Sequence, residues 1–161
     1  MEEEQMRYGG VLLSVSSVKA SRKFYEDLLG LEVYQDYGRN ISFDCGLSLQ
    51  EDFDWLAKIP KERILREPNN MELFFEEEDL DGFVKKLERY PGILYVHDMA
   101  EYPWGQRVIR FYDPDGHILE VGEDMRVVVG RFLGSGMSME DASKRMGVSV
   151  TDLEKILSDR G

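Results

Sequence analysis

FYDPDGHILE, residues 111–120, closes the second copy of a degenerate internal duplication in this chain. Its residues 113–116, DPDG, predict a turn, because proline fixes φ and glycine tolerates positive φ. The first copy closes with a weaker match, FDCGLSLQ at residues 43–50, in which the final glutamate has become glutamine. A repeated supersecondary unit is a strong indication of fold. The closing residue also bears on metal binding, because a carboxylate supplies the charge that a divalent cation needs.

Both copies predict the element order βαβββ. In the first copy, short apolar runs indicate strands over residues 11–15, 31–36, 40–45 and 47–50, and an apolar stripe indicates a helix over residues 20–29. In the second copy, strands are expected over residues 71–76, 93–97, 106–112 and 118–121, with a helix whose buried face holds Leu80, Phe83, Val84 and Leu87. An insertion over residues 51–66 lies between the copies and is expected to be helical around Phe53, Trp55 and Leu56.

Side-chain parity divides each copy into two faces, because alternate residues of a strand point to opposite sides of a sheet. One face is apolar and is expected to pack beneath the helices: Val11, Leu13, Val15, Ile41, Phe43, Cys45, Leu47, Leu49, Leu73, Phe75, Ile109, Phe111, Leu119 and Val121. The opposite face mixes polar and aromatic side chains, among them Glu72, Phe74, Arg110, Tyr112 and Glu120. Such a lining suits a ligand cavity, and the alternative is a solvated outer face.

Charge is distributed unevenly along the 161 residues, whose net charge is −12. Residues 1–124 hold 14 Lys and Arg against 27 Asp and Glu, whereas residues 125–161 hold 6 against 5. We therefore predict a domain over residues 1–124 and a carboxy-terminal appendage over residues 125–161. An acidic body repels phosphate backbones, so nucleic acid is not an expected partner.

The single cysteine, Cys45, cannot form an internal disulfide, and residues 1–5 lack the basic and apolar run of a signal peptide. We therefore expect a cytoplasmic protein. No apolar run approaches the roughly 20 residues that span a bilayer, so no membrane association is expected.

Three motifs resemble the vicinal-oxygen-chelate superfamily, which includes glyoxalase I, bleomycin-resistance proteins, fosfomycin-resistance enzymes and extradiol dioxygenases. They are FYEDLLGL at residues 24–31, WGQR at residues 104–107, and DPDGH at residues 113–117 followed by Glu120. The resemblance covers about residues 8–123. It implies an α+β fold in which two βαβββ modules, about residues 8–50 and 69–123, form a cupped mixed sheet. It also implies a homodimer, because related proteins are often dimers.

Metal-dependent relatives hold a divalent ion with one residue near the start and one near the end of each module. Carried onto this sequence, the resemblance places those positions at Gly10, Gln50, Glu72 and Glu120. Gln50, Glu72 and Glu120 can bind Mg²⁺ or Mn²⁺ through oxygen, whereas Zn²⁺ is disfavoured without a histidine. If Glu72 and Glu120 converge without a cation, their repulsion raises at least one pKa and creates a candidate general base. Both glutamates are therefore candidate catalytic residues.

Five further residues are candidates for ligand contact: Arg110, Tyr112, Phe74, Trp104 and His97. A guanidinium can bind a carboxylate or phosphate in bidentate fashion, but Arg110 can equally neutralise Glu72 or Glu120 in a structural pair. Phe74 and Trp104 can supply an aromatic wall. His117 shares the parity of Leu119 and is expected to belong to the turn.

Two capping boxes indicate helices in the appendage, SMED at residues 138–141 and SVTD at residues 149–152. With Gly147 in the connection, residues 138–157 are typical of a helix-turn-helix unit. The appendage has almost no net positive charge, so docking or dimerisation is favoured over DNA binding.

Three functions are compatible with these features. The favoured one is a small-molecule-binding protein with a degenerate metal site, whose ligand lies on the concave face of the sheet. The alternatives are a divalent-metal-dependent lyase, isomerase or transferase, and a ligand-sensing regulator that uses the helix-turn-helix appendage.

Overall fold

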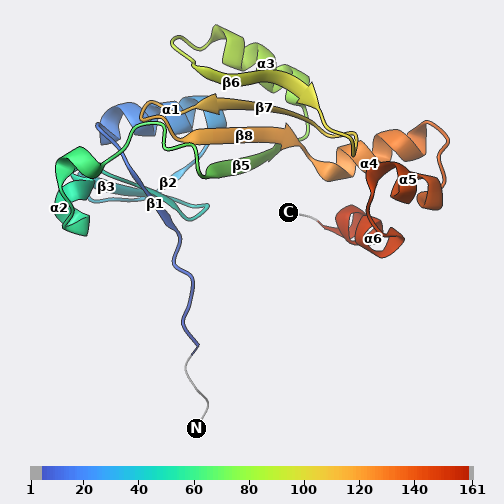
Figure 1. Ribbon diagram of the computed structural model, residues 1–161, viewed down its shortest axis with the longest axis horizontal. Helices are drawn as coiled ribbons and strands as arrows, with labels where there is room; N and C mark the ends of the chain where they lie inside the picture. The colour runs from blue at the N-terminus through green and yellow to red at the C-terminus, as the bar shows by residue number, and fades with distance from the viewer. Residues whose placement is uncertain (1–4, 160–161) are drawn as a thin grey trace. The chain divides into compact units, whose positions relative to one another are not determined.

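Each copy of the duplication folds into its own four-stranded mixed sheet, as the computed structural model shows (Figure 1). The first sheet holds β1 (Val11–Ser14), β2 (Val33–Asp36), β3 (Asn40–Phe43) and β4 (Leu47–Gln50), in the order β1-β4-β3-β2. The second holds β5 (Glu72–Glu77), β6 (Tyr95–Glu101), β7 (Arg107–Tyr112) and β8 (Ile118–Glu123), in the order β5-β8-β7-β6. In both sheets the first pair is parallel and the other pairs are antiparallel. The predicted α+β duplication is thereby confirmed.

The structure describes residues 5–159 and divides into two compact units. Unit 1 is Met1–Pro68 with Asp113–His117, and unit 2 is Asn69–Tyr112 with Ile118–Gly161. Residues 1–4, on which most of the signal-peptide argument depends, lie outside the described residues.

One helix covers the apolar face of each sheet, as the periodicity predicts. Helix α1 (Val18–Leu29) begins at Ser17, whose side chain accepts from the Ala20 amide, and ends at Gly30 with a φ of 68°. It contacts β3 and β4. Helix α3 (Leu80–Arg89) begins at Asp79 and contacts β8. Each unit has its own core of buried apolar residues. In unit 1 they are Leu13, Val15, Val18, Phe24, Tyr25, Leu28, Ile41, Phe43, Leu47 and Leu49, and in the sheet and α3 of unit 2 they are Leu80, Phe83, Leu87, Val108, Ile109, Phe111, Leu119 and Val121.

Two parts of the apolar-face prediction differ from the structure. Cys45 is exposed, because β3 ends at Phe43 and the chain turns before Gly46. Val11, Leu73 and Phe75 are only half-buried. The insertion contains a short helix, α2 (Phe53–Ala57), and a 3-10 turn, η1 (Lys61–Arg63), neither of which has a buried residue.

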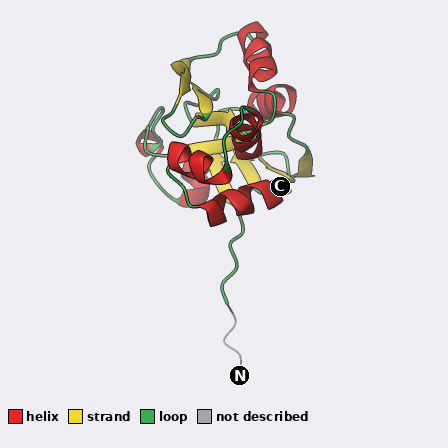
Figure 2. Cartoon of the chain, turned by 90° about the vertical axis from the view of Figure 1, so that its right-hand side faces the viewer, coloured by secondary structure: helices red, strands yellow, loops and turns green. Residues whose placement is uncertain are grey.

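Three helices form the appendage, α4 (Met125–Gly134), α5 (Met139–Met146) and α6 (Val150–Ser158), and Figure 2 draws the helices of the chain in red. Ser138 and Ser149 cap α5 and α6 as expected, since each side chain accepts from the amide three residues later. The helices share a small core, whose fully buried members are Val128, Val129, Ala142, Met146 and Leu153. The appendage belongs to unit 2. Within residues 5–159, no helix has both the length and the apolar character needed to cross a membrane.

Candidate functional site

Strand register aligns four predicted site residues in one row across the second sheet. Phe74 on β5 lies opposite Glu120 on β8, Glu120 lies opposite Arg110 on β7, and Arg110 lies opposite His97 on β6. Side chains directly opposite each other on neighbouring strands share a face and interact. The fold therefore brings together residues that are up to 46 positions apart in the sequence.

Arg110 is the centre of this row. Its guanidinium forms an ion pair with Glu120, and it donates to the two carboxylate oxygens of Glu72 at 3.3 and 3.4 Å. Its Nη1 donates to the Tyr102 hydroxyl at 2.7 Å and lies 3.1 Å from Nε2 of His97. Partial burial opposes the charge, but the hydrogen bonds to Glu72 and Tyr102 and the charge of Glu120 raise the pKa of Arg110. We call these five residues the Arg110 cluster.

His97 completes the cluster through both of its ring nitrogens. Its Nδ1 lies 2.6 Å from the Asp98 carbonyl oxygen, which can only accept, so Nδ1 carries the proton. Nε2 is then free to accept from Arg110. The predicted ligand-contact residue thus serves here to orient the guanidinium.

The cluster carries an excess of negative charge, because two carboxylates face one guanidinium. Burial raises the pKa of Glu120, Arg110 lowers it, and repulsion from Glu72 raises it, with a net upward shift. Of the two roles predicted for Arg110, the structure shows the ion pair. A guanidinium already held by two carboxylates is a poor receptor for an anionic ligand.

Aromatic rings border the cluster. Tyr102 and Trp104 are stacked, with ring centroids 4.9 Å apart and an angle of 22° between planes. The Trp104 side chain is 38% exposed and Phe74 is 49% exposed, so both offer ring surface to a ligand. Sequence reasoning missed Tyr102, because the predicted strand ended at residue 97 whereas β6 continues to Glu101.

Tyr112 does not join the cluster, since its hydroxyl donates to the Asn69 side chain at 2.8 Å. Its predicted ligand role, like those of the other site residues, stays a prediction.

Hydrogen bonds to the Asp113 carboxylate hold the Asp113–His117 turn together. The buried Asp113 carboxylate accepts from the Tyr25 hydroxyl, from the amides of Asp115 and His117, and from the His117 ring, at 2.7 to 2.9 Å. Burial raises the pKa of Asp113, but the hydrogen bonds from His117 and Tyr25 more than offset this and lower it. His117 belongs to the turn, as its parity predicts.

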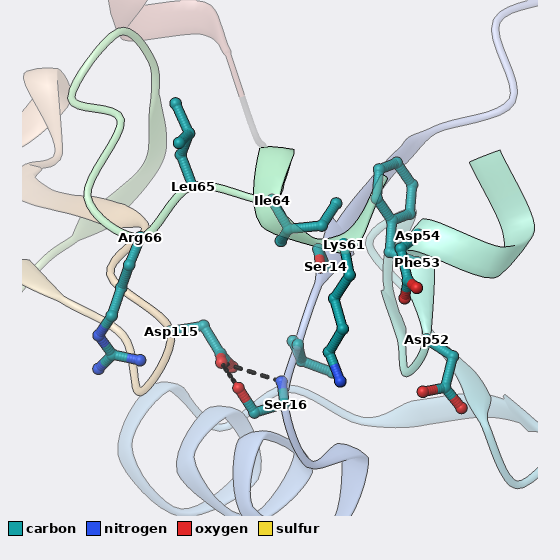
Figure 3. Close-up of a pocket in the computed structure, with 11 residues that line it drawn as sticks. Ser14, Ser16, Asp52, Phe53, Asp54, Lys61, Ile64, Leu65, Arg66 and Asp115 are labelled. Atoms are coloured by element: carbon teal, nitrogen blue, oxygen red, sulfur yellow. Dashed lines mark hydrogen bonds between the residues drawn. The ribbon is translucent and has the colours of Figure 1, made fainter. Parts of the chain in front are cut away.

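Unit 1 contains a cavity of about 350 Å³ beside the end of β1 and the insertion (Figure 3). Most of its charged groups already have partners. Asp115 accepts from the Ser16 amide and hydroxyl. Arg66 donates to the Pro114 carbonyl, and Asp52 forms an ion pair with Arg39. The lining also includes Lys61, Asp54 and Ser14, and Figure 3 shows the Lys61 side chain directed into the cavity. Sequence reasoning treated this insertion only as a helix and missed the cavity.

The residues that the resemblance implies for a divalent cation do not fit one in this arrangement. Glu72 and Glu120 already form ion pairs with the Arg110 side chain, which occupies the place of a cation. Gln50 accepts from Asn40 through Oε1 and donates to a backbone carbonyl through Nε2. Among residues 5–159, no group of three or more His, Cys, Asp and Glu side chains is arranged to hold a metal ion. The metal set Gln50, Glu72 and Glu120 stays a prediction.

The start of the first module offers no ligand either. A Cβ atom on Gly10 would lie 2.4 Å from the Gly46 carbonyl oxygen, and Gly10 has a φ of 131°, so the backbone there resists any side chain. Strand register shows that Leu12, rather than Gly10, corresponds to Glu72: Ser14 pairs with Gln50 as Phe74 pairs with Glu120, and Leu12 and Glu72 each lie two residues earlier. Neither glycine nor leucine can coordinate a metal through its side chain.

Two βαβββ modules of identical strand order, with a polar row across the second sheet, define a protein of the vicinal-oxygen-chelate superfamily. The chain belongs to the glyoxalase-like domain family, whose model matches residues 8–126.

Solved structures with the same fold agree. A protein of unknown function from Agrobacterium tumefaciens strain C58 is 34% identical, with a TM-score of 0.64, over 74% of this chain and 95% of that one. A lactoylglutathione lyase from Agrobacterium tumefaciens is 24% identical, with a TM-score of 0.56, over 76% and 96% of the two chains. A glyoxalase-related enzyme from Fulvimarina pelagi is 18% identical, with a TM-score of 0.63, over 75% and 90%. The last two similarities concern the fold alone.

Proposed function

We propose that this protein binds a small molecule on the face of the second sheet that carries the Arg110 cluster, and that it does so without a divalent metal. The observation that carries this proposal is the pairing of Arg110 with both Glu72 and Glu120. In this arrangement a side chain supplies the positive charge that a metal would bring to the two carboxylates. The face is then available for recognition rather than for Lewis-acid chemistry.

The ligand class follows from charge and shape. Two carboxylates around one guanidinium leave a net negative charge, which favours a cation. The exposed rings of Phe74 and Trp104 favour a planar group, and aromatic faces attract cations. A planar aromatic cation therefore meets both features, and a bleomycin-resistance-like role, in which the protein sequesters a ligand, is the corresponding activity.

A pair of dyes tests this proposal by isothermal titration calorimetry. Proflavine is a planar aromatic cation, and 8-anilinonaphthalene-1-sulfonate is an aromatic anion. We expect proflavine to bind and the anion to bind more weakly. Glu72→Gln removes one exposed charge of the cluster and should weaken proflavine binding about five-fold, the size of a charge interaction at close range in water.

Glu88→Gln is the matched control, because Glu88 is exposed on α3, the helix that covers the opposite face of the second sheet. It should leave the proflavine affinity unchanged. The proposal fails if wild-type protein does not bind proflavine, or if Glu72→Gln and Glu88→Gln have the same effect. It also fails if the protein binds one equivalent of Mg²⁺ or Mn²⁺ and a turnover that depends on this metal is lost in Glu120→Gln.

A further inference from the structure

Two helices of the appendage contact residues 103–105, the segment that precedes β7. From α4, Arg131 donates to the Gly105 carbonyl at 2.9 Å. The Phe132 ring lies so close that a Cβ atom on Gly105 would be 2.4 Å from it. From α5, Arg145 donates to the Pro103 carbonyl and lies over the Phe132 ring, 5.3 Å from its centroid. These side chains fix the backbone of residues 103–105 from one side.

A buried carboxylate, that of Glu123, joins α4 to the second sheet. Glu123, at the end of β8, accepts from both Nη atoms of Arg131 at 2.9 and 3.1 Å. It also accepts from the amide and guanidinium of Arg107 at 2.9 and 3.1 Å. The Glu123 backbone carbonyl accepts from the Gln106 side chain at 3.0 Å. The appendage and residues 106–107 are therefore held by one residue.

A series of contacts leads from this segment to the candidate ligand site. Gln106 accepts from the Trp104 indole at 2.9 Å, and Trp104 stacks on Tyr102. The Tyr102 hydroxyl accepts from Arg110 at 2.7 Å. The backbone of Tyr102 is also tied to the segment, since its carbonyl accepts from the Gly105 amide at 2.8 Å. Every step from Arg131 to Arg110 is a hydrogen bond or a ring stack.

We propose that the appendage sets the ligand affinity of the Arg110 cluster by holding residues 102–106, with Arg131 and Arg145 as positioning residues. The appendage lies almost entirely beyond the family match, which ends at residue 126. The ligand part rests on the proposed function, whereas the positioning of Trp104 does not. Coupling between two sites is reciprocal, so ligand should also steady the appendage.

The experiment uses full-length protein with Trp55→Phe, which leaves Trp104 as the only tryptophan. Arg145→Met removes an exposed side chain and its contacts with Pro103 and Phe132. Lys144→Met is the matched control, because Lys144 is the exposed neighbour on α5 and makes none of these contacts. We measure the emission maximum and acrylamide quenching of Trp104 without ligand, the proflavine affinity by calorimetry, and the far-UV circular dichroism as a check on folding.

We expect Arg145→Met to shift Trp104 emission to the red, to increase its quenching and to weaken proflavine binding about five-fold or more, the lower end of coupling between sites. Lys144→Met should change none of these, and Arg145→Lys, which keeps the charge and a donor, should restore much of the affinity. Arg131→Met should act in the same direction.

Two results overturn the inference. One is unchanged Trp104 emission and quenching in both Arg145→Met and Arg131→Met. The other is a changed Trp104 signal with undiminished proflavine affinity, which separates the segment from the ligand site. If wild-type protein does not bind proflavine, the proposed function fails, and the Trp104 measurements still decide whether the appendage positions the segment.

Discussion

Replacing Glu123 with glutamine tests the contribution of a buried carboxylate to the stability of unit 2. The Glu123 side chain is 3% exposed and accepts from Arg107 and Arg131. Burial alone would raise its pKa, but hydrogen bonds from the two arginines lower it from 4.5 to about 2. Each pKa unit is about 1.4 kcal/mol, so the ionised form gains about 3 kcal/mol in the folded state. Glu123→Gln keeps the shape of the side chain and should lose most of this free energy of unfolding.

The sign of the pH dependence follows from the lowered pKa. A carboxyl group whose pKa is lower in the folded than in the unfolded state stabilises the protein above the unfolded pKa. For Glu123 the contribution is complete above pH 4.5 and is lost as the pH falls toward about 2. The difference in stability between wild type and Glu123→Gln should therefore be largest near neutral pH and should shrink through this window.

Urea unfolding followed by Trp104 fluorescence, in a Trp55→Phe background, reports on the unit that contains Glu123. Asp81→Asn is the control, because Asp81 is the other acidic partner of Arg107 but its side chain is 62% exposed. It should cost much less, since solvent screens an exposed ion pair. The reasoning is refuted if Glu123→Gln destabilises the protein by less than about 1 kcal/mol, or by no more than Asp81→Asn does.

Three further outcomes are expected. Tyr25→Phe removes a hydrogen bond to the buried Asp113 carboxylate and should lower the free energy of unfolding by about 1.5–3 kcal/mol. Tyr112→Phe should lower it by less, because the Tyr112 side chain is only half-buried, and equal losses in the two variants would contradict this. Gly105→Ala places a Cβ against Phe132 at a φ of 87° and should cost about 1–3 kcal/mol with a red shift of Trp104 emission; unchanged stability would show that the contact is loose. Light scattering should give twice the 18.7 kDa chain mass if the predicted homodimer forms, and a monomer mass would refute it.

Local periodicity was enough to predict most of the elements. Helix α1 buries Phe24, Tyr25 and Leu28 of the predicted stripe, although it begins at Val18, two residues before the predicted start. The capping boxes at Ser138 and Ser149 are equally local, since each acts within four residues. Such features depend on neighbours along the chain, so a single sequence contains them.

The choice between the two predicted roles of Arg110 could not be made in the same way. Glu72 lies 38 positions away in sequence, and its contact with Arg110 depends on the pairing of three strands and on side-chain rotamers. Tyr102 reaches the cluster because β6 continues past two irregularities in its register with β7, on either side of His97. Sequence parity identified the face, but it left open whether the guanidinium binds a ligand or the two glutamates.

The two copies show how one backbone carries different chemistry. In the first sheet the cross-strand pair Asn40 and Gln50 forms a neutral hydrogen bond of 2.9 Å. At the corresponding place in the second sheet, Arg110 and Glu120 form an ion pair. Because strand order and pairing are the same, the difference comes from the side chains alone. The Asn40–Gln50 hydrogen bond carries no charge. Arg110 pairs with Glu72 as well as with Glu120, so this group has an excess of negative charge. Recognition of a cation is therefore expected from the second copy.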